Sequence, residues 1–69
     1  MDGFMERLVN EKIELDERRE KLDSFLNSDK VKGVDTLQKS LLIVQCSIMS
    51  SYSKILTERI SLLTKVNAE

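Results

Sequence analysis

Residues 41–60, LLIVQCSIMSSYSKILTERI, decide the fold because their apolar side chains recur every seven residues. One apolar row consists of Leu42, Met49, Leu56 and Leu63. A second row beside it consists of Leu41, Ile48, Ile55 and Leu62, and Leu37, Val44 and Ile60 widen the surface. A helix that packs on one partner shows an apolar stripe of about 100°. This surface is wider, so we expect the first row to close a helical hairpin and the second to join protomers.

One border of this helix carries Gln45, Tyr52 and Arg59, which are seven residues apart and therefore nearly in line. Such a border is either the seam of an assembly or part of a site. We assign Gln45 and Tyr52 to the seam. Arg59 is a candidate site residue, because a guanidinium beside a buried face needs a partner.

The segment before this stretch predicts a first helix over residues 3–26, with Leu8, Leu15 and Leu22 at a seven-residue repeat. The neighbouring row is charged in its middle, at Glu11 and Arg18. These charges either stay solvated or paired along the helix, or they face an interface or cleft where Arg18 meets an anionic ligand. The sequence leaves both interpretations open.

Residues 27–34, NSDKVKGV, predict the turn between the helices. A single helical turn is expected over residues 29–32, and Gly33 can adopt the left-handed conformation that ends a short turn. Asp35 followed by Gln38 resembles a capping box, which predicts a second helix over residues 35–66. The expected fold is all-α: one hairpin domain over residues 1–69 that assembles into a homo-oligomeric helical bundle.

Length and composition favour self-association. A chain of 69 residues buries little surface and usually needs a disulfide, a metal or a partner. One Cys and no His exclude an intramolecular disulfide and predict no metal site and no cofactor. Residues 1–30 carry a net charge of −3 and residues 31–69 carry +2, which favours antiparallel packing of the two helices.

Several function classes are disfavoured. The net charge of −1 argues against binding to polymeric nucleic acid. Without His there is no Ser/His or Cys/His pair, and no Gly-rich phosphate loop is present, so we expect no enzyme. Charges within residues 41–60 make a membrane span costly. The free Cys46 fits a reducing compartment, so we expect a cytoplasmic protein.

Binding remains possible at the start of the chain, where Phe4 is followed one turn later by Arg7. An aromatic ring can stack on a base, and a guanidinium can neutralise a phosphate. The amino end of a helix adds favourable partial charge for an anion. An aromatic residue at this place is also a common packing residue, so the pattern alone leaves the role of Phe4 open.

The combined order and spacing of these residues carry a family resemblance over residues 4–60. The first helix and the residues just after it contribute Phe4, Arg7, Leu8, Glu11, Lys12, Leu15, Arg18, Lys21, Leu22, Phe25, Leu26 and Ser28. The second helix contributes Leu41, Leu42, Gln45, Met49, Tyr52, Ile55, Leu56, Arg59 and Ile60. This pattern resembles short helical phage proteins related to crAss-phage small proteins. It is also similar to the second-type anti-CBASS sponges, which sequester cyclic oligonucleotides.

The resemblance implies immune evasion without catalysis, in the cytoplasm of a bacterial host. Such sponges are homo-oligomers of helical hairpins, typically hexamers, which hold cyclic di- or trinucleotides between protomers. It implies ligand-binding roles for Phe4, Arg7, Arg18 and Arg59. Phe4 stands where relatives carry Tyr, which retains stacking and removes a phenol hydrogen bond.

Two alternatives remain. A structural or adaptor oligomer would use the same apolar rows without any ligand. An inhibitor would dock its acidic first helix on a host protein.

Overall fold

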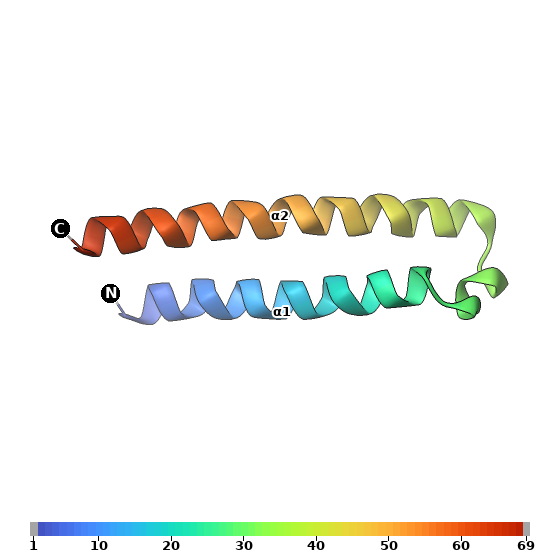
Figure 1. The fold of residues 1–69 in the computed structure, drawn as a ribbon, viewed down its shortest axis with the longest axis horizontal. Helices are drawn as coiled ribbons and strands as arrows, with labels where there is room; N and C mark the ends of the chain where they lie inside the picture. Colours follow the sequence, from blue (N-terminus) through green and yellow to red (C-terminus); the bar gives the residue numbers. More distant parts are fainter. Residues whose placement is uncertain (1, 69) are drawn as a thin grey trace.

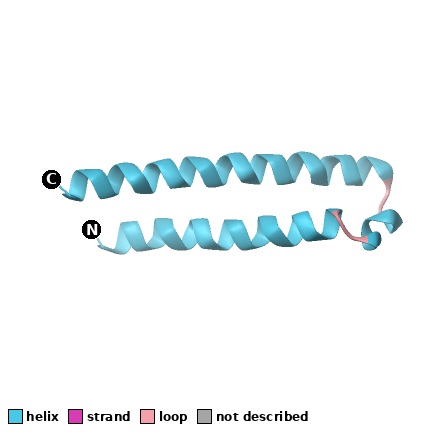
Figure 2. Cartoon of the chain, in the orientation of Figure 1, coloured by secondary structure: helices cyan, strands magenta, loops and turns pink. Residues whose placement is uncertain are grey.

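The computed structural model describes residues 2–68 as two long antiparallel helices joined by a short helical turn (Figure 1). Helix α1 spans Asp2–Leu26, the 3-10 helix η1 spans Asp29–Gly33, and α2 spans Thr36–Ala68. The described residues contain no strand (Figure 2), so the all-α prediction is confirmed. The hairpin measures 52 × 15 × 14 Å, and its radius of gyration is 15.7 Å. A compact domain of this length would have about 11 Å, so the molecule is a rod.

The turn is held by side-chain caps at both of its ends. Ser28 Oγ donates to the carbonyl of Phe25 at 2.8 Å and accepts from the amide of Lys30 at 3.3 Å. Asp35 Oδ2 accepts from the amides of Leu37 and Gln38 at 3.1 and 3.3 Å, which caps the amino end of α2. Each cap satisfies backbone donors that the helix itself leaves free.

The predicted left-handed conformation of Gly33 is wrong. No residue in the described part of the chain has a positive φ. The chain instead reverses through η1, where the amide of Val34 donates to the carbonyl of Val31 at 3.0 Å. Val31 is 6% exposed, so its burial fixes the turn without help from a glycine.

The core is a narrow line of leucines between α1 and α2. Leu8, Leu15 and Leu56 form the buried cluster, and Leu56 is 0% exposed. Partly buried side chains pack around this cluster: Met49, Ile60 and Leu63. We call Leu42, Met49, Leu56 and Leu63 the inner row of α2. Burying a leucine contributes about 1.5–3 kcal/mol, so this short line is a small core for the length of the rod.

The other apolar row of α2 is left exposed by the hairpin. We call it the outer row; it consists of Leu41, Ile48, Ile55 and Leu62, which are 57%, 62%, 57% and 60% exposed. Leu37 and Val44 beside it are also exposed. The total accessible surface is 5529 Å², against about 4,500 Å² for a compact monomer of this mass. Association through the outer row therefore stays a prediction, with a large apolar surface to account for.

Candidate functional site

A polar cluster lies on one side of the seam between the two helices. Lys12 Nζ binds Asp16 Oδ2 at 2.7 Å, and Ser53 Oγ donates to Asp16 Oδ1 at 2.6 Å. Lys12 also donates to Ser53 Oγ at 3.3 Å, and Arg19 Nε lies 3.8 Å from Asp16 Oδ1. The Lys12 hydrogen bond first, and the Ser53 hydrogen bond next, hold the pKa of Asp16 below its usual value. The carboxylate is therefore ionised at neutral pH, and its hydrogen bonds join the two helices.

The hydrogen bond between Asp16 and Ser53 also shows which sides of the two helices face the same way. In α1, Asp16 and Arg18 lie on opposite sides of the buried Leu15, because each residue advances about 100° around a helix. In α2, Ser53 and Tyr52 lie on opposite sides of Leu56 by the same geometry. Since Asp16 and Ser53 share one face of the hairpin, Arg18 and Tyr52 share the other.

All four predicted ligand-binding residues fall on this second face. Phe4 and Arg7 precede Leu8 by four and one positions, and Arg59 follows Leu56 by three, which places each on the side of Arg18 and Tyr52. We call this the arginine face, defined by Phe4, Arg7, Arg18, Tyr52 and Arg59. The sequence prediction did not state that these residues share a face, because that depends on how the two helices align.

The same residues are spread along the length of the rod. Measured from the level of Asp16 and Ser53, Arg18 lies about 3 Å toward the turn at 1.5 Å per residue. Arg59 lies about 9 Å, and Phe4 about 18 Å, toward the open end. Phe4 and Arg18 are thus about 21 Å apart along the axis. The structure does not bring them together within one protomer.

Each side chain of the arginine face is open to solvent. Phe4 is 48% exposed, Tyr52 is 42% exposed, and the three arginines are exposed. Nη1 of Arg7 lies 3.8 Å from the point that a Cβ on Gly3 would occupy, so this guanidinium folds back toward the start of α1. Among the described side chains, none of the three arginines forms an ion pair. Glu11, also exposed, lies between Arg7 and Arg18 along α1 and separates these two cationic side chains.

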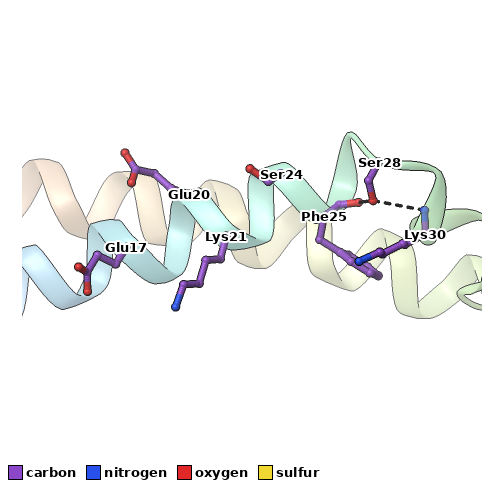
Figure 3. A pocket seen from close by; sticks show the side chains of 7 residues that line it. All are labelled: Glu17, Glu20, Lys21, Ser24, Phe25, Ser28 and Lys30. Carbon is purple, nitrogen blue, oxygen red and sulfur yellow. Dashed lines mark hydrogen bonds between the residues drawn. The ribbon is translucent and has the colours of Figure 1, made fainter.

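An open hollow lies near the turn, and none of the predicted site residues lines it. It is bordered by Glu17, Glu20, Lys21, Ser24, Phe25, Ser28 and Lys30 (Figure 3). Figure 3 shows Glu20 and Ser24 extending to one side of α1 while Lys21 extends to the other. The two carboxylates offset the two ammonium groups, so the hollow has no net charge to attract an anion. Sequence reasoning missed both this hollow and the Lys12–Asp16–Ser53 cluster.

The described residues offer neither a candidate metal site nor a candidate membrane span. They contain no group of three His, Cys, Asp or Glu side chains that could hold a metal ion. Over their described residues, neither α1 nor α2 contains an apolar stretch that is long enough to cross a bilayer.

Comparison with known proteins gives one match. A family model described as Sequestin matches residues 2–62. No curated protein and no solved structure matches the chain. The matched range includes all of α1, the whole turn and most of α2, and it contains every residue of the arginine face. The chain therefore belongs to the Sequestin family.

Proposed function

We propose that this protein is a phage anti-CBASS sponge: a non-enzymatic homo-oligomer that binds and sequesters cyclic di- or trinucleotide signals in the cytoplasm of a bacterial host. The family name is consistent with a sequestering role. The observation that carries the proposal is the arginine face. Three arginines and two aromatic rings lie along one side of the hairpin, opposite the Lys12–Asp16–Ser53 cluster.

The chemistry of this face suits a cyclic nucleotide. Its bases offer flat surfaces for Phe4 or Tyr52 to stack on, and its phosphates accept paired hydrogen bonds from guanidinium groups. Arg7 folds back toward the start of α1, where the helix dipole also favours an anion. Phe4 supplies a ring without a hydroxyl, so base stacking is the interaction expected of it.

The spacing of the face calls for more than one protomer. Phe4 and Arg18 lie about 21 Å apart along the rod, which is too far for one cyclic dinucleotide to touch both within one chain. A site between protomers can combine residues from different levels of two rods. The exposed outer row of α2 supplies an apolar surface for that association. A hexamer is the assembly that we propose by resemblance.

The proposal of binding without catalysis follows from the groups on this face. The sequence has no His, the side chain that most often acts as a general acid or base. Sequestration needs only affinity and enough copies of the protein. Its effect is therefore stoichiometric.

Calorimetry with a panel of cyclic di- and trinucleotides tests the proposal. We expect at least one ligand to bind, and Arg18→Ala and Arg59→Ala to weaken it by about 10-fold each, because a charged hydrogen bond is worth about 1.5–3 kcal/mol. Arg19→Ala is the matched control, since Arg19 lies beside Asp16 near the opposite side of the seam. The proposed function would be overturned if no ligand in the panel binds with a Kd below about 100 µM, which corresponds to a binding free energy of about −5.5 kcal/mol.

A structural or adaptor oligomer is the second candidate, favoured by the exposed outer row. It predicts that the arginine substitutions alter assembly or stability and that no cyclic nucleotide binds. An inhibitor acting through α1 predicts instead a stoichiometric host protein recovered with the wild-type chain from bacterial lysate.

A further inference from the structure

The outer row of α2 reads the same in both directions. Its residues are Leu, Ile, Ile and Leu at seven-residue spacing, at positions 41, 48, 55 and 62, and all four are more than half exposed. A row with this symmetry is complementary to a second copy of itself running antiparallel. Leu41 then meets the partner's Leu62, and Ile48 meets the partner's Ile55. An interface of this kind is isologous, as in the two-fold dimers that dominate soluble oligomers.

Charge distinguishes this arrangement from parallel pairing. In a parallel pair, Glu58, Arg59 and Lys65 would each lie level with the same residue of the partner, which places like charges opposite one another. In the antiparallel register, Arg59 lies level with the partner's Val44, and Glu58 lies level with the partner's Gln45. The side-chain amide of Gln45 can donate a hydrogen bond to a carboxylate. Antiparallel pairing therefore avoids all three repulsions.

The antiparallel register also determines where the arginine face of each copy lies in the pair. Around α2, the row of Gln45, Tyr52 and Arg59 lies between the inner row, which packs on α1, and the outer row. A two-fold axis between antiparallel helices runs perpendicular to both. It therefore places the two α1 helices on the same side of the central α2 pair, the side that carries Tyr52. The result is a groove with Tyr52 on its floor and α1 as each wall.

The axis of this pair passes close to Ser51 and Tyr52. Arg18 lies level with residue 51 of its own chain, given the hydrogen bond between Asp16 and Ser53. Both copies of Arg18 therefore stand at the middle of the groove, one on each wall. The two Arg59 side chains lie about 11 Å to either side of the axis. Phe4 lies further out, near the ends.

We propose that two copies pair antiparallel through the outer row of α2, and that Tyr52 and Arg18 of both copies line one two-fold groove for the cyclic nucleotide. This inference rests on the proposed function for its ligand. It assigns to Tyr52 the stacking role at the centre of the site. A cyclic dinucleotide has two bases and two phosphates, which match the two phenol rings and two guanidinium groups across the axis.

Cysteine cross-linking tests the pairing without any ligand. In a Cys46→Ser background, Ser51→Cys should form a disulfide dimer because the two-fold axis brings both copies within the distance a disulfide spans. Leu41→Cys should stay uncross-linked by itself and should cross-link when mixed with Leu62→Cys. Rapid cross-linking of Leu41→Cys with itself, or failure of Ser51→Cys to dimerise, overturns the antiparallel pairing.

Ligand titration of Tyr52 variants tests the groove. Tyr52→Ala should weaken binding of the cyclic nucleotide by about 10-fold, and Tyr52→Phe should keep it within about twofold, because stacking needs the ring and not the hydroxyl. Sedimentation of both variants should give the wild-type mass, which excludes loss of assembly as the cause. If a ligand binds and Tyr52→Ala leaves its affinity unchanged, the groove is wrong while the proposed function stands. If no ligand binds, the function fails and the cross-links still decide the pairing.

Discussion

The inner and outer rows of α2 contain similar residues at the same spacing, but the hairpin packs the inner row against α1 and leaves the outer row exposed. Leu56 of the inner row is 0% exposed, whereas Ile55 directly before it in the outer row is 57% exposed. The apolar content of α2 therefore exceeds what one partner helix can cover. The inner row holds the two helices of one chain together, and we propose the exposed outer row as the surface for association between chains.

The largest expected effect is on the inner row. Leu56→Ala removes the most buried side chain of the core, so the free energy of unfolding should fall by about 2–5 kcal/mol. Urea denaturation followed by circular dichroism measures this loss. Leu56→Met, which keeps the volume, should cost less than about 1.5 kcal/mol. A loss below about 1 kcal/mol for Leu56→Ala would contradict the packing of the inner row.

Substitutions in the outer row should weaken association between chains without unfolding the helices. Ile48→Asp places a charge in the centre of the expected interface and should weaken association by about 100-fold, since burying an uncompensated polar group costs about 1–3 kcal/mol. Sedimentation equilibrium measures the change as a fall in mass toward 8.0 kDa. Ser47→Asp, on the neighbouring exposed polar position, is the matched control and should keep the wild-type mass. Equal masses for the wild type and Ile48→Asp would remove the outer row from the interface.

The smallest effect concerns the polar contact that accompanies the inner row. Because the pKa of folded Asp16 lies below its usual value, its carboxylate stabilises the fold above the pKa of the unfolded chain. That contribution is lost as the pH falls below about 3.9 and through the lowered pKa of the folded state. Melting temperatures between neutral and acidic pH should show a shallower acid loss for Asp16→Asn than for the wild type. Parallel curves for the two proteins would mean that Asp16 does not couple folding to protonation.

Helical periodicity was enough to predict the two rows and the helix pair. Seven-residue spacing specifies which residues share a face of one helix, and the all-α fold followed from it. The turn was predicted only in part. The expected helical turn over residues 29–32 is found as the 3-10 helix Asp29–Gly33. Gly33 does not adopt the left-handed conformation, because the burial of Val31 and the Ser28 cap hold the turn.

The relation between the two helices also lay beyond the sequence. The Lys12–Asp16–Ser53 cluster depends on which residues of α1 and α2 stand level, and the turn geometry sets that alignment. The same alignment places Phe4, Arg18 and Arg59 on one face and spreads them along the rod. The residue types of the site were predicted from the sequence and the resemblance, and their ligand-binding roles stay predictions. The role proposed for Tyr52 required the structure.

Native mass spectrometry with and without a cyclic dinucleotide decides whether two chains share one ligand, because it reports chains and ligands in one measurement. We expect an assembly containing an even number of 8.0 kDa chains, which takes up one ligand for every two chains. A folded single chain that binds the ligand alone would contradict the shared groove. An assembly that takes up no ligand would contradict sequestration.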